Sequence, residues 1–268
     1  MKKLLIASAA FAAMIGAPAF AADLALKAPP PAPAPVWSWT GFYIGGNVGW
    51  IGINDASMSS TPNDAATTAA ATTCIAVGSC LQNYGTTRGS GVIGGGQIGY
   101  NWQVQNYVVG LETDFQGTSA RASTAVANTI LAPFVGTEST RENYLGTVRG
   151  RLGVLATPSL LAYVTDGYAY ASVNRNWTGG YASLLETWGG SSTSTVSGWT
   201  GGGGLEWAVG HGFTLGAEYL YVRLNGGNNF VTAATGTGCT GICQFAITGS
   251  SFNDNIVRVK LNYIFGGH

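Results

Sequence analysis

The sequence has little charge. Asp, Glu, Lys and Arg make up 9% of the 268 residues, whereas 46% are hydrophobic; a soluble domain typically carries about 25% charged residues. Long apolar runs are also lacking, because beyond the N-terminus no window approaches the ~18 apolar residues of a membrane-spanning helix. Low charge without such helices indicates the other architecture that crosses a membrane, a closed β-barrel.

Histidine is scarce as well, with only His211 and His268 in the chain. A hydrolytic site needs a base beside a nucleophile and an acid that orients the base, and two isolated histidines do not supply it. We therefore expect no enzyme, no catalytic residue, no cofactor and no bound metal. Residues 94–99 match the dinucleotide-binding pattern G-x-G-x-x-G, but no helix follows them, so glycines that permit close packing are the better interpretation.

The N-terminus has the pattern of an export signal. Two lysines precede an apolar stretch, and Ala19-Phe20-Ala21 is typical of a cleavage site. We expect residues 1–21 to be a signal peptide and residues 22–38, rich in Pro and Ala, to be an extended periplasmic lead-in. Cleavage removes two of the 12 basic residues and leaves 10 against 12 acidic ones, a net charge of −2. That balance argues against a nucleic-acid partner.

The rest of the chain divides into eight β-like segments, each about as long as the ~9–11 residues that cross a bilayer as a tilted strand. They are residues 39–50, 91–102, 107–116, 144–155, 160–172, 198–209, 213–224 and 255–265. Tight and long connections alternate between them. The tight ones are 103–106, 156–159 and 210–212, and the long ones are 51–90, 117–143, 173–197 and 225–254.

This alternation predicts the topology. If the segments run up and down, all tight connections lie on one side, and outer-membrane barrels have short periplasmic turns and long extracellular loops. We expect an all-β, eight-stranded antiparallel up-and-down transmembrane β-barrel over residues 39–265, followed by a C-terminal extension over residues 266–268. The even number of strands places both termini in the periplasm. The barrel pattern with its sorted loops indicates a bacterial outer membrane.

Apolar and polar residues alternate along the segments, as lipid outside and a polar lumen inside require. The fifth segment is the least regular, and its one charged residue is used to assign its inward face. The inward charges are then Glu112, Asp114, Arg149, Arg151, Asp166, Glu206, Glu218, Arg258 and Lys260. Because an eight-stranded barrel has room only for its own side chains, we interpret them as a salt-bridge network that plugs the lumen, in preference to an ion path.

Aromatic residues gather near the segment ends, as in the girdles of outer-membrane barrels. The expected periplasmic girdle contains Trp39, Trp102, Tyr107, Trp207, Phe213, Tyr263 and Phe265. The expected outer girdle contains Trp50, Trp199 and Tyr221. Aromatic residues at both ends indicate a membrane boundary on each side.

The four cysteines form two pairs that are close in sequence, Cys74 with Cys80 and Cys239 with Cys243. Each pair falls within one long connection, and an exported protein passes through an oxidising compartment. We predict two small disulfides within loops. A four-cysteine zinc site is the alternative, but no histidine or acidic residue lies nearby to support it.

Residues 39–49, which read WTGFYIGGNVG, resemble the opening strand of the small outer-membrane immunogenic, porin-like surface antigens of alphaproteobacteria. Residues 22–24 with the spacer after them, and residues 217–222, are similar to the same family. The resemblance covers the whole chain and implies an eight-stranded barrel like the N-terminal half of the major outer-membrane protein A. Members are abundant structural proteins and antigens, and some are linked to haem binding or host contact.

The resemblance also implies partners. We expect outer-membrane lipid and lipopolysaccharide around the barrel, the barrel assembly machinery during insertion, and host or environmental ligands at the extracellular loops. Barrels of the family usually end at the aromatic residue that the assembly machinery reads, whereas Gly266, Gly267 and His268 follow Phe265 here.

Three functions are compatible with these features. The first is a structural surface barrel that presents loops and supports envelope integrity. The second is a small low-conductance porin or a haem- or ligand-binding, adhesin-like protein, and conductance in planar bilayers separates it from the first. The third is a lipid-modifying barrel enzyme, which the shortage of histidine disfavours.

Overall fold

A computed structural model describes residues 37–55, 58–62, 87–128, 134–181, 186–225, 230–235, 243–249 and 251–266. These residues form β-strands and short connections, and none of them belongs to a helix long and apolar enough to span a membrane. The expected signal peptide and most of the lead-in lie outside the described residues. So do Cys74, Cys80, Cys239 and His268, and the two proposed disulfides with them.

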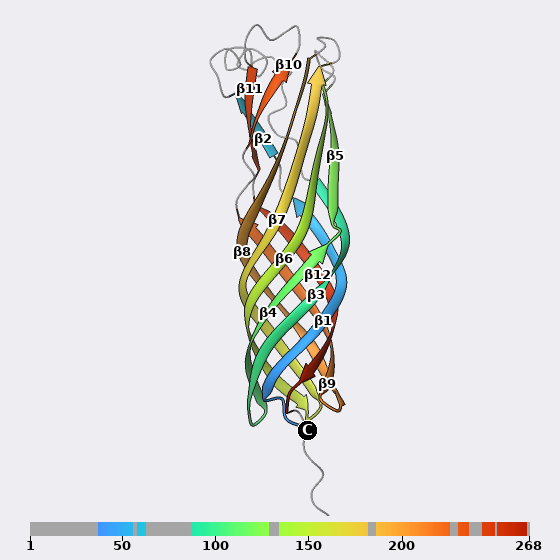
Figure 1. Ribbon diagram of the computed structural model, residues 1–268, viewed down its shortest axis with the longest axis vertical. Helices are drawn as coiled ribbons and strands as arrows, with labels where there is room; N and C mark the ends of the chain where they lie inside the picture. The colour runs from blue at the N-terminus through green and yellow to red at the C-terminus, as the bar shows by residue number, and fades with distance from the viewer. Residues whose placement is uncertain are drawn as a thin grey trace, which may run out of the picture. The chain divides into compact units, whose positions relative to one another are not determined.

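Eight antiparallel strands close into a ring, as the sequence predicts (Figure 1). In ring order they are β1 (Gly41–Asp55), β3 (Thr87–Val104), β4 (Tyr107–Thr118), β6 (Phe134–Thr157), β7 (Leu160–Tyr181), β8 (Glu186–Gly210), β9 (Phe213–Asn225) and β12 (Phe252–Ile264). Each strand is hydrogen-bonded to the next one in this order, and the pairing of β1 with β12 closes the ring.

The three tight connections are turns of two residues, between β3 and β4, β6 and β7, and β8 and β9. Positive φ angles help two of these reversals: Gln105 has a φ of 56° in the β3–β4 turn and His211 one of 54° in the β8–β9 turn, where the glycines on both sides of it also have positive φ. His211 thus serves as a turn residue. All three turns lie at the same end of the barrel (Figure 1).

At the opposite end the strands are much longer than the sequence indicates. β6, β7 and β8 contain 24, 22 and 25 residues, about twice what crossing a bilayer requires. The segments that we expected to be loops contain further strands, β2 (Met58–Pro62), β5 (Arg121–Asn128), β10 (Phe230–Thr235) and β11 (Cys243–Gly249). β5 pairs with β3 and β6, while β10, β11 and β2 continue in order from β8.

The outward face of the ring is apolar over its lower part, where Val109, Leu111, Leu215 and Val259 are among the exposed side chains. Higher up on β7 and β8 the outward side chains become polar, including Asn176, Thr193 and Thr195. Tyr168, Trp199 and Tyr221 lie between the two zones, and the rings of Trp199 and Tyr221 are 5.6 Å apart. The apolar zone therefore ends at the expected outer girdle, and the extended wall continues beyond it.

Candidate functional site: a layered, closed lumen

The lumen is filled by side chains in four successive layers, and the inward residues of β12 belong to all four. From the turn end upward they are Ile264 in an apolar mouth, Lys260 and Arg258 in a charged layer, Ile256 in an apolar layer and Asp254 in an upper polar layer. All five side chains are buried. Since inward residues recur every second position of a strand, the layers follow one another along the barrel axis.

The mouth at the turn end is closed by residues that precede β1. Trp39 is fully buried, against Tyr43, Tyr163 and Ile264 among others. Its backbone NH donates to the side chain of Gln103, and its indole NH donates to the carbonyl of Pro158. The end of β3 and the turn between β6 and β7 are thereby fastened to the start of the barrel. We expected Trp39 in the lipid-facing girdle, and that prediction is wrong because the chain turns inward before β1.

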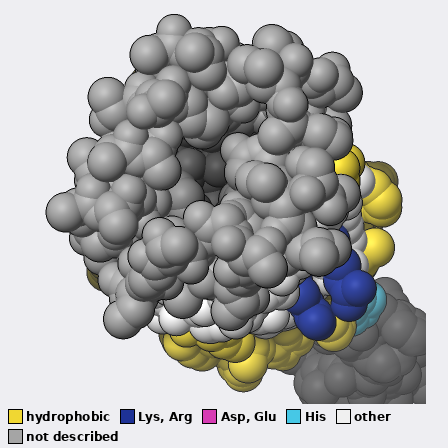
Figure 2. Space-filling model, turned by 90° about the horizontal axis from the view of Figure 1, so that it is seen from above, with side chains coloured by type: hydrophobic (Ala, Val, Ile, Leu, Met, Phe, Trp, Pro, Cys, Tyr) yellow, Lys and Arg dark blue, Asp and Glu magenta, His cyan; other side chains and the backbone are white. Residues whose placement is uncertain are grey.

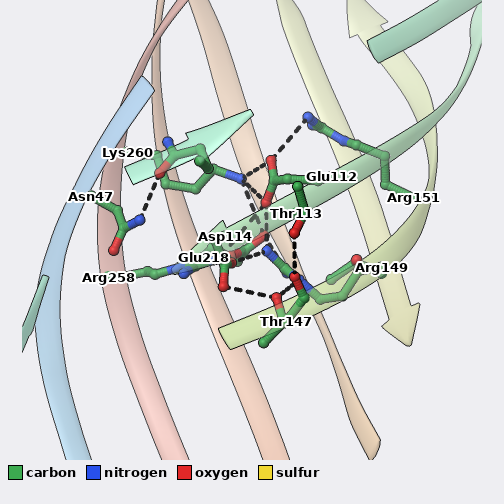
Figure 3. Close-up of polar contacts among 12 residues, drawn as sticks. Asn47, Glu112, Thr113, Asp114, Thr147, Arg149, Arg151, Glu218, Arg258 and Lys260 are labelled. Carbon is green, nitrogen blue, oxygen red and sulfur yellow. Dashed lines mark hydrogen bonds and ion pairs between the residues drawn. The ribbon is translucent and has the colours of Figure 1, made fainter. Parts of the chain in front are cut away.

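The charged layer contains four carboxylates and four cations, from Glu112, Asp114, Glu206, Glu218, Arg149, Arg151, Arg258 and Lys260. Figure 3 shows its centre, where cations from two walls converge on carboxylates from two others. These side chains are at most 2% exposed. A buried charge is tolerated only when it is paired and hydrogen-bonded, and equal numbers of both signs satisfy that condition.

Arg149 on β6 is the most connected cation of the layer. Its guanidinium donates to Glu112, lies 2.8 Å from the Asp114 carboxylate and 3.2 Å from the Glu218 carboxylate on the opposite wall. Arg258 bridges the same Asp114 and Glu218 from β12. The Lys260 ammonium lies 2.7 Å from Glu112 and 3.4 Å from Glu218. These contacts join β4 and β6 to β9 and β12 across the lumen, and the side chains that make them are at most 2% exposed.

Neutral side chains satisfy the remaining acceptors. The hydroxyl of Tyr43 donates to Glu112 at 2.8 Å, and that of Tyr163 donates to Glu218 at 2.8 Å. Glu206 accepts from Arg151, Thr214 and Asn262. The planar Arg151 guanidinium also stacks 4.1 Å above the Tyr163 ring. The layer is therefore a hydrogen-bonded network rather than a set of isolated pairs.

Gly99 illustrates why glycine is needed in so narrow a lumen. A Cβ at this position would lie 2.4 Å from the Tyr43 ring, a distance at which the ring has to move. If the ring moved, the Tyr43 hydroxyl would lose its hydrogen bond to Glu112. The glycines of residues 94–99 thus make room for packing, as the sequence indicates.

An apolar layer covers the charged one. Its members come from seven of the eight strands of the ring and include Ile51, Ile93, Leu145, Ala169, Val196, Leu220 and Ile256. They are between 0% and 6% exposed, and they offer no polar atom to water or to an ion. This layer is a second, chemically different seal.

The upper polar layer lies beyond the outer girdle and was not expected. Arg175 reaches from β7 to within 5.7 Å of the Phe252 ring on β12. Glu142 and Asp254 are buried near each other. Burial, and then the charge of Asp254, raise the pKa of the Glu142 carboxyl well above its ordinary value. Residues 135–142 alternate between inward and outward side chains, which was the available signal for this layer, although a register shift between Glu142 and Tyr144 changes the phase from that of the rest of β6.

Asp166 corrects one sequence assignment. Eight of the nine charges that we assigned to the lumen lie in the charged layer, but Asp166 is exposed on the outward face of β7, between Val164 and Tyr168. The inward residues of that strand are Leu161, Tyr163 and Thr165. The assignment failed because the inward residues of β7 that lie beside Arg149 and Arg151 are uncharged, so the one charged residue of the expected segment 160–172 does not mark its inward face.

Comparison with known proteins agrees with this architecture. Residues 7–265 match the model of the outer membrane protein beta-barrel domain family. The chain belongs to this family. The chain is similar over nearly its whole length to the 31 kDa outer-membrane immunogenic proteins of Brucella melitensis biotype 1 and Brucella suis biovar 1. Each is 38% identical over 273 residues, covering 99% of this chain and 100% of the relative. The resemblance to outer-membrane immunogenic surface antigens is thereby confirmed.

Solved structures with a similar fold are much more distant. OprG from Pseudomonas aeruginosa is 11% identical, with a TM-score of 0.45 over 87% of this chain and all of that one. Ail of Yersinia pestis is 10% identical, with a TM-score of 0.32 over 84% of this chain and 99% of that one. Scores this low support no inference about function.

Proposed function

We propose that this outer-membrane barrel is a non-conducting structural protein that anchors an elevated surface platform and supports envelope integrity. One observation carries the proposal: the lumen is closed by a charged layer of four ion-paired carboxylates and four cations, and by an apolar layer directly above it. An ion that crosses would have to break buried pairs and then leave water altogether, and each step is unfavourable.

The orientation is part of the proposal. The two-residue turns and both chain ends face the periplasm, and the extended wall of β6, β7 and β8 stands outside the cell. Short periplasmic turns and long extracellular segments in related barrels support this arrangement. Residues 1–21 act as a signal peptide for export, and disulfides Cys74–Cys80 and Cys239–Cys243 stiffen the outer segments.

The same proposal includes the partners. The outer segments meet host or environmental ligands, and the assembly machinery inserts the barrel into a membrane of lipid and lipopolysaccharide. The protein carries out no catalysis in this proposal. In support, His211 sits in a turn between two glycines, where no acid–nucleophile pair accompanies it among the described residues.

Recording single-channel current in planar bilayers tests the proposal. The purified full-length mature chain should add no steady current above the bare bilayer. A steady ohmic current at low voltage from most inserted molecules would instead identify a small porin. Binding of haem to the purified barrel, with loss of binding when the outer segments are trimmed, would favour the ligand-binding alternative.

A further inference from the structure

Basic side chains outside the lumen are distributed very unevenly over the described part of the barrel. They are Arg88, Arg121, Arg141 and Arg223. All four are exposed arginines, and all four lie on the extended side of the outer girdle. Arg223 follows Tyr221 by two residues on the same face of β9, and Arg141 precedes Tyr144 on β6.

Three of these residues form a cluster, which we call the arginine patch: Arg88, Arg121 and Arg141. Arg121 on β5 is directly opposite Arg141 on β6. Arg121 is also opposite Ser90 on β3, and Arg88 is the next residue on the same face of that strand. Directly opposed side chains have Cβ atoms ~5 Å apart, and diagonal ones ~7–8 Å. The three guanidinium groups are thus within reach of one ligand.

Nothing acidic neutralises the patch among its described neighbours. The outward residues paired with it or next to it are Asn54, Ser123, Ser139 and Asn174. None of the three arginines forms an ion pair with a described residue. In the view from above (Figure 2), basic side chains gather at one side beside hydrophobic ones, and the coloured part of that view shows no acidic side chain.

Such a cluster is unfavourable for the barrel alone. Like charges directly opposite each other destabilise a sheet, and the barrel has acidic residues elsewhere but none at this place. An anion bound between the arginines would remove the repulsion. Arginine suits phosphate in particular, because its planar fork of donors binds phosphate oxygens in pairs.

The position of the patch, next to the end of the apolar outward face, indicates which anion it binds. Phe115 and Tyr144, whose rings are 5.3 Å apart, end the apolar face of β4 and β6 just below it. Side chains at this level lie at the lipid headgroups, where basic residues attract anionic lipids. We propose that the arginine patch binds the phosphorylated headgroup of lipopolysaccharide in the outer leaflet. This inference rests on the proposed orientation, which puts the extended wall outside.

Titration of the detergent-solubilised mature chain with lipid A tests the inference without depending on orientation. The probes are bisphosphorylated lipid A and the same lipid without phosphates. The matched variants are Arg121→Gln and Arg223→Gln, which make the same change at one exposed arginine inside the patch and at one outside it. Because a basic residue near an anionic surface contributes about fivefold in affinity, Arg121→Gln should weaken binding about fivefold and the triple variant, with Arg88 and Arg141 also changed to Gln, on the order of a hundredfold.

Three further results are expected: Arg223→Gln keeps the wild-type affinity, phosphate-free lipid binds weakly to every form, and added salt reduces the difference between the variants. A second readout guards against misfolding. Without lipid, Arg121→Gln should unfold at a urea concentration no lower than the wild type does, because the substitution removes repulsion between arginines. Lipid A should raise the urea midpoint of the wild type more than that of the variant.

Two results would overturn the inference. One is equal loss of lipid A binding in Arg121→Gln and Arg223→Gln. The other is displacement of lipid A by inorganic phosphate at a matching concentration, which would indicate a site for small anions. If instead antibody tagging shows the extended wall in the periplasm while lipid A binding follows the patch, the orientation fails and the binding site stands.

Discussion

At the scale of single residues, the contrast between Arg149 and Arg223 shows how position decides the value of a charge. Arg149 contacts three carboxylates in the lumen, whereas Arg223 is exposed. Removing one partner of a buried pair typically costs about 3–5 kcal/mol, because the other charge is left without compensation. We expect Arg149→Ala to lower the free energy of unfolding in urea by that order, and Arg223→Ala to leave it nearly unchanged. Equal unfolding midpoints would contradict the pairing described here.

Asp166 and Asp114 offer the same comparison for a carboxylate. Asp114 accepts from Arg149 and Arg258 in the lumen, while Asp166 lies among apolar side chains on the outward face. A charge that faces lipid is destabilising to a degree that depends on depth. Asp166→Asn should therefore raise the resistance to urea in lipid vesicles modestly, and Asp114→Asn should lower it. A loss of stability in both variants would mean that Asp166 has a partner in the membrane.

We expect Glu142 to make the free energy of unfolding depend on pH. Its pKa is raised in the folded state, so the folded protein holds this proton more tightly than the unfolded chain. The contribution of Glu142 to the free energy of unfolding consequently falls as pH rises above the unfolded value of ~4.3 toward the raised pKa. We expect Glu142→Gln to remove that fall.

Urea unfolding at pH 4 and pH 8 measures the effect. The free energy of unfolding of the variant should equal that of the wild type at pH 4 and be larger than that of the wild type at pH 8. Parallel profiles for the two proteins would show that Glu142 ionises as freely in the folded state as in the unfolded chain.

At the scale of elements, the proposed orientation, with the extended strands outside the cell, predicts which segments an antibody can reach. A tag inserted at Thr129, between β5 and β6, or at Gly236, after β10, should bind antibody on intact cells. A tag at Gly210, beside the turn between β8 and β9, should bind only after the outer membrane is opened. Antibody binding at Gly210 on intact cells, together with no binding at Thr129, would show that the orientation is the reverse of the one proposed.

The elements also show what the sequence is able to predict. Where lipid faces one side of a strand and charge the other, alternation assigns the faces correctly, as it does for Arg149 and Arg151 on β6 and for Arg258 and Lys260 on β12. It fails for Asp166, because the inward residues of β7 that lie beside Arg149 and Arg151 are uncharged. A reversal of polarity along the upper strands likewise keeps the extended wall from being predicted from the sequence.

On the upper part of β7 the polarity is reversed. Val173 and Trp177 point inward and Asn174 and Asn176 outward, because water replaces lipid there. Rich in Ser, Thr and Gly, such stretches look like loops to any rule calibrated on membrane strands. The cross-lumen partners, such as Glu218 for Arg149, were also beyond the sequence, since strand order does not specify which opposite side chains meet.

At the scale of the whole molecule, the seals of the lumen act in series, so the tightest layer sets the current. We expect Arg149→Ala alone to add little conductance, because the apolar layer remains closed. Combining it with Leu145→Ala and Ile256→Ala should produce measurable single-channel current in planar bilayers, and Arg223→Ala serves as the control. Substantial current from Arg149→Ala alone would show that the charged layer is the only barrier.

The distribution of the network over the strands has a consequence for how the barrel is completed. Along the chain, β4 brings two acids, β6 two bases, β8 and β9 one acid each, and β12 two bases. The set is therefore short of two positive charges until the final strand is seated against β1. A barrel that closed without β12, or with β12 shifted by one residue so that Arg258 and Lys260 faced lipid, would hold unbalanced carboxylates inside and expose cations outside. Correct closure is thus distinguished electrostatically from premature or misregistered closure, and the last strand to be made is the one that completes the balance.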